Sequence, residues 1–95
     1  MAQRELFIFA RFYAKEGLQH EVAATINDVL APTRLEAGCI AIDAFCATQD
    51  LRLFYIHSRW KDEAAFDHHA QLPHTLRFAE QVQNLIDHPF EVTRT

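Results

Sequence analysis

The segment LFIFARFYA, residues 6–14, is apolar at almost every position and decides the fold. Side chains of a strand alternate between two faces. As a strand, this segment has two faces that are both rich in apolar side chains, with Leu6, Ile8, Ala10 and Phe12 on one and Phe7, Phe9, Arg11 and Tyr13 on the other. A strand that is apolar on both faces is typical of a sheet that is covered on both sides. The segment therefore predicts a central strand with packing partners above and below it.

The spacing of apolar residues predicts the elements that follow this strand. Apolar residues recur every three or four positions between Leu18 and Thr33, which predicts an amphipathic helix with Pro32 near its end and Gly38 as its stop signal. Beyond it we expect strands at 39–48 and 51–60 joined by a short turn, two helices separated at Pro73, and a closing strand at 90–95.

Alternation and helical spacing also predict which side chains face inward. For the second strand these are Ile40, Ile42, Ala44 and Cys46, and for the last helix they are Leu76, Ala79, Val82, Leu85 and Ile86. The two cysteines, Cys39 and Cys46, are seven residues apart and are expected on opposite faces of one strand. Their separation of about 23 Å along a strand excludes a disulfide between them.

The predicted order of elements is βαββαβ, within a single domain that spans residues 1–95. This order, with an antiparallel hairpin and two crossovers, predicts an α+β fold of the ferredoxin-like type. Helices cover only one face of such a sheet, so a second copy of the chain is expected on the other face. The alternative is a monomer that exposes an aromatic-rich face.

Composition excludes several classes of function. The net charge is −4 and both signs are mixed along the chain, so no basic stripe for nucleic acid is present. No apolar run reaches the length that spans a membrane. Residues 1–5 are polar and lead directly into the first strand, unlike a secretion signal. Two reduced thiols are typical of a cytoplasmic protein.

Several segments, taken together and in order, resemble a known family. They are the first strand, PTRLEAGC (32–39), SRWKDE (58–63), HAQLPH (69–74) and PFEVTR (89–94). The chain resembles the antibiotic biosynthesis monooxygenase (ABM) domain over essentially its whole length, close to the small quinol-monooxygenase-like members that consist of this domain alone. The resemblance implies ferredoxin-like dimers with facing sheets, and oxygenases that act on phenolic or quinol substrates without metal or flavin.

Oxygenation without a cofactor requires a base that converts a phenol into its electron-rich anion inside an apolar pocket. Histidine suits this task because its ordinary pKa is about 6.5. We expect His69 or His74 to be the catalytic base, since the resemblance places both at the mouth of the cavity between helices and sheet. The alternative is that His69 is half-buried and bonded to the backbone, and that His74 caps a helix.

Four further residues are candidates for contact with a small aromatic or quinol-like substrate. Trp60 and Phe66 offer aromatic walls, although a buried tryptophan is also a common core residue. Arg11 interrupts an aromatic face and could hold a substrate oxygen or pair with Asp43 or Glu91. Tyr55 could donate its hydroxyl, or it could belong to a dimer interface together with its neighbours on the strand.

No metal or other cofactor is predicted. His68 and His69 are adjacent and diverge on a helix, and no histidine pair with a third ligand has the usual spacing. Only two glycines are present, so there is no glycine-rich phosphate loop.

Three other functions are compatible with the sequence. The resemblance also extends to haem-degrading proteins, which use an asparagine that the first strand lacks, and to proteins that process signal molecules. The third is a non-catalytic ligand-binding or stress-associated dimer.

Overall fold

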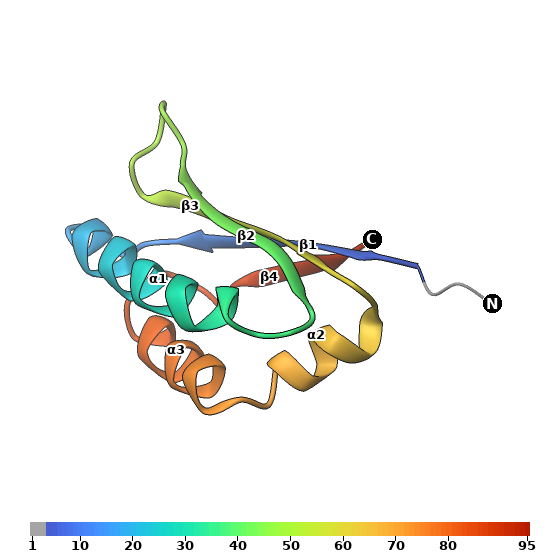
Figure 1. Ribbon diagram of the computed structural model, residues 1–95. Coiled ribbons are helices and arrows are strands. Elements are labelled where there is room, and N and C mark those ends of the chain that lie inside the picture. Colours follow the sequence, from blue (N-terminus) through green and yellow to red (C-terminus); the bar gives the residue numbers. More distant parts are fainter. Residues whose placement is uncertain (1–3) are drawn as a thin grey trace.

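The computed structural model describes residues 4–95 of the chain, so most of the polar segment at 1–5 lies outside the described residues. Four strands form one sheet in the order β2-β3-β1-β4. Their neighbours all run antiparallel, as Figure 1 shows. The elements follow the predicted order: β1 (Leu6–Tyr13), α1 (Gln19–Arg34), β2 (Cys39–Cys46), β3 (Leu53–Trp60), α2 (Glu63–His69), α3 (Pro73–Gln83) and β4 (Glu91–Arg94). This is the ferredoxin-like βαββαβ fold.

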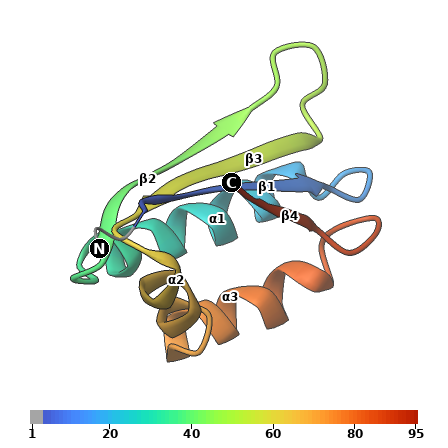
Figure 2. The same ribbon diagram turned by 90° about the vertical axis from the view of Figure 1, so that its right-hand side faces the viewer.

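Within residues 4–95, the three helices lie on one side of the sheet and leave the other side bare (Figure 2). Strand β1 shows why, because its burial alternates: Leu6, Ile8, Ala10 and Phe12 are buried on the helix side, whereas Phe9 and Arg11 are exposed. Antiparallel register carries this division across the sheet, since directly paired residues share a face. Ile56 and Ser58 of β3 therefore join the helix side opposite Ala10 and Ile8.

Helix α1 supplies much of the core through the predicted stripe. Its buried residues are Val22, Ile26, Val29, Leu30 and Thr33. Thr33 is polar, and its hydroxyl donates to the carbonyl of Val29 at 2.7 Å within the helix. Full burial of such a stripe is favourable because each large aliphatic side chain contributes roughly 1.5–3 kcal/mol. Pro32 lies inside the last turn, and the helix continues through it to Arg34.

The short connections between helices are set by local chemistry. The carboxylate of Asp62 caps α2 by accepting from the backbone N–H of Ala65 at 2.8 Å. Pro73 occupies the first turn of α3, as predicted. Between α1 and β2, Gly38 passes so close to α2 that a Cβ on it would lie 2.4 Å from the Cβ of Ala65. Only glycine allows the end of α1 and the start of α2 to approach in this way.

Two predicted inner faces were wrong in part. A register shift between Cys39 and Ala41 interrupts the alternation of β2, so Ile40 is exposed and not paired with Ile42 in the core. The same shift places Cys39 and Cys46 on one face of the sheet, where they pair in register with the buried Trp60 and Phe54, and not on opposite faces as predicted. Both thiols are free, as expected. In α3 the buried residues are Phe78 and Val82, and Leu76 is exposed because the helix is rotated relative to the predicted stripe.

None of the helices in residues 4–95 combines the length and the hydropathy needed to cross a membrane.

Candidate active site

A cavity of about 440 Å³ lies between the helices and the sheet. Its walls are mainly apolar, with Ile8, Ile42 and Ile56 from the sheet and Phe78 from α3. Ligand pockets commonly have volumes of roughly 300–1,000 Å³, apolar walls and a few polar groups that fix orientation. The cavity is therefore large enough for a small aromatic molecule. The polar side chains on its wall are Thr33, Ser58, His69, Thr75 and Arg94.

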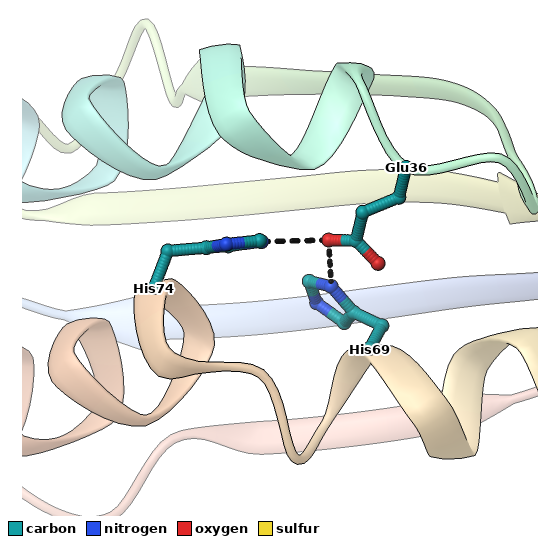
Figure 3. Close-up of side chains that lie close together, drawn as sticks. All are labelled: Glu36, His69 and His74. Carbon is teal, nitrogen blue, oxygen red and sulfur yellow. Dashed lines mark hydrogen bonds and ion pairs between the residues drawn. The ribbon is translucent and has the colours of Figure 1, made fainter.

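Three helix ends meet beside this cavity and bring Glu36, His69 and His74 together (Figure 3). Glu36 follows the end of α1, His69 is the last residue of α2, and His74 is the second residue of α3. One carboxylate oxygen, Oε2 of Glu36, lies 2.7 Å from Nδ1 of His69 and 2.7 Å from Nε2 of His74. All three side chains are largely buried, so these bonds hold the ends of three helices in one place.

The hydrogen bonds of His69 determine which of its nitrogens can act as a base. An ionised carboxylate only accepts hydrogen bonds, so the contact with Glu36 assigns the ring proton to Nδ1 of His69. The hydroxyl of Thr75 lies 3.2 Å from the same nitrogen. In a neutral ring the other nitrogen, Nε2, then carries the lone pair. His69 is also a wall residue of the cavity, which gives this ring the arrangement of a carboxylate-oriented base.

The surroundings of His69 favour its neutral form. Burial lowers the pKa of His69 below its ordinary value of 6.5, and the nearby His74 acts in the same direction. The carboxylate of Glu36 raises this pKa, but burial and His74 together outweigh it. The indole ring of Trp60 provides part of the apolar contact, with its centre 4.6 Å from that of His69. His69 is therefore neutral, and able to accept a proton, near pH 7.

Trp60 is placed behind the cavity wall and not on it. It is fully buried, and its indole N–H donates to the hydroxyl of Ser58 at 3.0 Å. Ser58 itself is a buried wall residue. Since its oxygen accepts from Trp60, its own proton is free to point toward a ligand. Trp60 thus supports His69 and Ser58, and the predicted stacking of a substrate on its ring is not what this geometry provides.

Phe66, by contrast, lies on the cavity wall as predicted. Its ring packs against Trp60 and His69, with centres 5.6 Å away in each case. Arg94 of β4 also lies over this ring, 4.9 Å from its centre, and pairs with Glu63 and Asp67. Arg94 was not predicted as a site residue because its register with Ile8 is visible only in the folded sheet.

Arg11 and Tyr55 lie on the bare face of the sheet, where they are paired in register. Arg11 forms an ion pair with Glu91 at 3.9 Å, one of the two partners expected for it. Neither residue lines the cavity on the helix side. The structure therefore does not bring Arg11 and Tyr55 together with His69, because both belong to the opposite set of alternating side chains. Their contact with substrate stays a prediction.

His69 and His74 are brought together as predicted, but their positions differ. His69 lines the cavity, whereas His74 reaches Glu36 from the far side and is not among the wall residues. Glu36, like Arg94, is a site residue that sequence reasoning missed. It lies 33 residues before His69, and its one visible signal was its place in the Arg34-x-Glu36-x-Gly38 segment, beside the glycine that permits close approach.

The same three residues have the geometry of a possible metal site. Their ligand atoms all lie within 4.8 Å of one another. The spacing of histidines along the sequence did not reveal this group, because its carboxylate comes from the end of a different helix.

The thiol of Cys39 is not poised as a nucleophile, since burial raises its pKa and Glu36 adds to this effect.

We predict that Glu36→Gln lowers the pKa of His69 further, because it removes the carboxylate that now raises it. Trp60 is the only tryptophan in the chain and lies against His69, and a protonated imidazole quenches indole fluorescence. A pH titration of the emission should show a midpoint below 6.5 in the native protein and a lower midpoint in Glu36→Gln. His68→Gln should leave the midpoint unchanged, and His69→Gln should remove it. A higher midpoint in Glu36→Gln would contradict the assignment.

Comparisons with known proteins agree with this architecture. The family model described as antibiotic biosynthesis monooxygenase matches residues 6–81. The chain is 29% identical over 86 residues to "Putative monooxygenase Rv0793" of Mycobacterium tuberculosis, covering 90% of this chain and 84% of the relative. The solved structure of Rv0793 superposes with a TM-score of 0.92 and covers 97% of this chain and 93% of that one. PA3566 from Pseudomonas aeruginosa also superposes with a TM-score of 0.92, at 27% identity, covering 100% of this chain and 95% of that one. The chain belongs to the antibiotic biosynthesis monooxygenase family.

Proposed function

We propose that this protein is a monooxygenase that oxidises a small phenolic or quinol substrate with O2 and needs no metal or flavin to do so. The family membership and the name of the relative from M. tuberculosis support a monooxygenase-type activity. The observation that most supports the finer proposal is the hydrogen bond from Nδ1 of His69 to Glu36 at the wall of an apolar cavity. It combines an oriented base with a water-poor site.

His69 starts the reaction in this proposal. Its Nε2 accepts the phenolic proton, and the hydroxyl of Ser58 donates to the oxygen anion that results. The anion then passes one electron to O2, and the two radicals combine to form a peroxide at a ring carbon that bears hydrogen. The peroxide anion takes the proton held by His69. Neutral His69 then accepts the hydrogen of that ring carbon as a proton while the O–O bond breaks, and it passes this proton to the departing hydroxide, which leaves as water. One oxygen atom becomes a carbonyl of the product, so the substrate supplies all the electrons.

The roles of the remaining residues follow from their positions. Phe66 and the isoleucines of the sheet form the apolar walls that hold a flat ring and exclude water. Glu36 orients His69, and His74 supplies the second hydrogen bond that keeps the carboxylate in place. His74 is therefore proposed as a positioning residue, and His69 as the base.

Oxygen uptake with a panel of hydroquinones and phenols tests this function. His69→Gln should lower kcat/KM by about 100-fold or more, the usual contribution of a general base. His74→Gln should have a smaller effect, and the exposed neighbour His68→Gln should have none. Because the base must be neutral, the rate should fall as the pH drops through the pKa of His69, which lies below 6.5.

Labelling with ¹⁸O2 separates a monooxygenase from an oxidase, since only the monooxygenase transfers one labelled atom into the product. If no substrate stimulates oxygen uptake, yet aromatic ligands still change the emission of Trp60, the proposal is wrong and the protein is a binding protein. Full activity in His69→Gln would show that the base is a different residue.

We also propose that the chain forms a homodimer through the bare face of its sheet. This face carries large exposed side chains, with Phe9, Phe45 and Tyr55 at 48%, 53% and 38% exposure. Such a concentration of exposed apolar surface on one face favours association. Arg11 with Glu91 and Arg59 with Glu5 add charges of both signs to the same face.

Sedimentation equilibrium at micromolar concentration tests this assembly. The native protein should have the mass of a dimer, and the double variant Phe9→Glu/Phe45→Glu should be a monomer, because like charges would face each other across the interface. Leu35→Glu changes an exposed leucine that follows α1, away from the sheet, and should remain a dimer. A monomeric native protein, or a dimeric double variant, would exclude this interface.

A further inference from the structure

The Glu36–His69–His74 cluster has the ligand set of a transition-metal site. A carboxylate oxygen and two imidazole nitrogens, all within 4.8 Å of one another, point at a common region. Zinc and related ions are bound by such ligands in proteins, often with three protein ligands and one further position for water. Around an ion at about 2.0–2.2 Å from each ligand, ligand atoms lie about 3.3 Å apart. The two separations of 2.7 Å therefore need to open by only about half an ångström.

The carboxylate of Glu36 can also accept a positively charged partner, which the described part of the chain does not supply. Its side chain is only 10% exposed, and its second oxygen, Oε1, is buried without a hydrogen-bond partner in the part of the chain that the structure describes. Within residues 4–95, both ion pairs recorded for Glu36 are to histidine rings, and none is to lysine or arginine. A buried carboxylate is costly unless its charge is compensated, so a cation at this point is favoured electrostatically.

One residue of the cluster borders a groove on the surface that is separate from the substrate cavity. A groove of about 380 Å³ on the surface is lined by Glu36, Gly38, Lys61 and His68, among others. His69 belongs to the inner cavity and not to this groove. Glu36 thus borders the outer groove, while its partner His69 borders the inner cavity. We expect an ion to approach from the Glu36 side.

We propose that Glu36, His69 and His74 bind one divalent transition-metal ion of zinc-like chemistry in place of the protons that join them, and that this ion inhibits the enzyme. The ion would be bound by Oε2 of Glu36, Nδ1 of His69 and Nε2 of His74. A neutral imidazole bound through Nδ1 keeps its proton on Nε2. Nε2 then becomes a donor, and His69 can no longer accept a proton from substrate. The inhibitory part rests on the proposed function, whereas metal binding does not.

Titration calorimetry of the full chain with Zn²⁺ tests binding. The native protein should bind one ion per chain, and Glu36→Gln and His74→Gln should each weaken binding by at least about tenfold, as expected for damage to a metal site. His68→Gln is the matched control, because it removes a neighbouring histidine outside the cluster, and it should bind as the native protein does. If one cluster variant fails to fold, the other decides the question. No saturable binding, or unchanged affinity in both cluster variants, would overturn the proposal.

Co²⁺ identifies the ligands by spectroscopy, without reference to activity. Nitrogen and oxygen ligation should give visible d–d bands and no intense thiolate charge-transfer band. A strong thiolate band would place the ion on Cys39 or Cys46 and overturn the site.

Inhibition is measured separately, by the loss of substrate-stimulated oxygen uptake when Zn²⁺ is added. Uptake that persists in the zinc-saturated protein would overturn the inhibitory part. If zinc binds at the cluster but no substrate is ever oxidised, the proposed function fails and the metal site stands.

Discussion

The shared carboxylate oxygen of Glu36 is the interaction on which the site depends. This oxygen accepts hydrogen bonds from His69 of α2 and His74 of α3, and Glu36 itself follows the end of α1. A largely buried carboxylate is stable only if donors compensate its charge, so the ends of α1, α2 and α3 are held at one point. The approach also requires Gly38, since any larger residue there would collide with Ala65 of α2. The same contact assigns the proton of His69 to Nδ1 and turns Nε2 into the available base.

The sheet separates two roles by the alternation of its side chains. On the helix side, residues of β1 and β3 form the floor of the cavity, with Ser58 as its buried hydroxyl. On the bare side, alternate residues of the same strands expose aromatic rings and ion pairs. A substitution on β1 or β3 therefore affects either the cavity or the proposed dimer interface, depending only on the parity of its position. This division explains why Arg11 and Tyr55 are unsuited to a role beside His69.

Much of the fold could be predicted from local patterns, and less of the site. The alternation over residues 6–14 and the stripe of α1 depend on neighbours in sequence, and the structure confirmed both. The bulge at Ile40 and the rotation of α3 toward Phe78 depend on packing partners, so spacing alone missed them. His69 was expected because the resemblance placed it at the mouth of the cavity, and Phe66 because its ring offered an aromatic wall. Glu36 and Arg94 were missed because their partners lie far away in the sequence, and Trp60 was expected on the wall although it lies behind it.

The position of the proton on His69 is the most direct test of this account. Two-bond ¹⁵N–¹H correlation spectra of the ¹⁵N-labelled protein distinguish a protonated ring nitrogen from one with a free lone pair, and His69→Gln identifies the signals. At a pH above the pKa of His69, the account predicts a neutral ring with its proton on Nδ1 and a free lone pair on Nε2. A neutral ring with its proton on Nε2 would contradict it, because Glu36 would then not orient the base and Nε2 could not accept a proton.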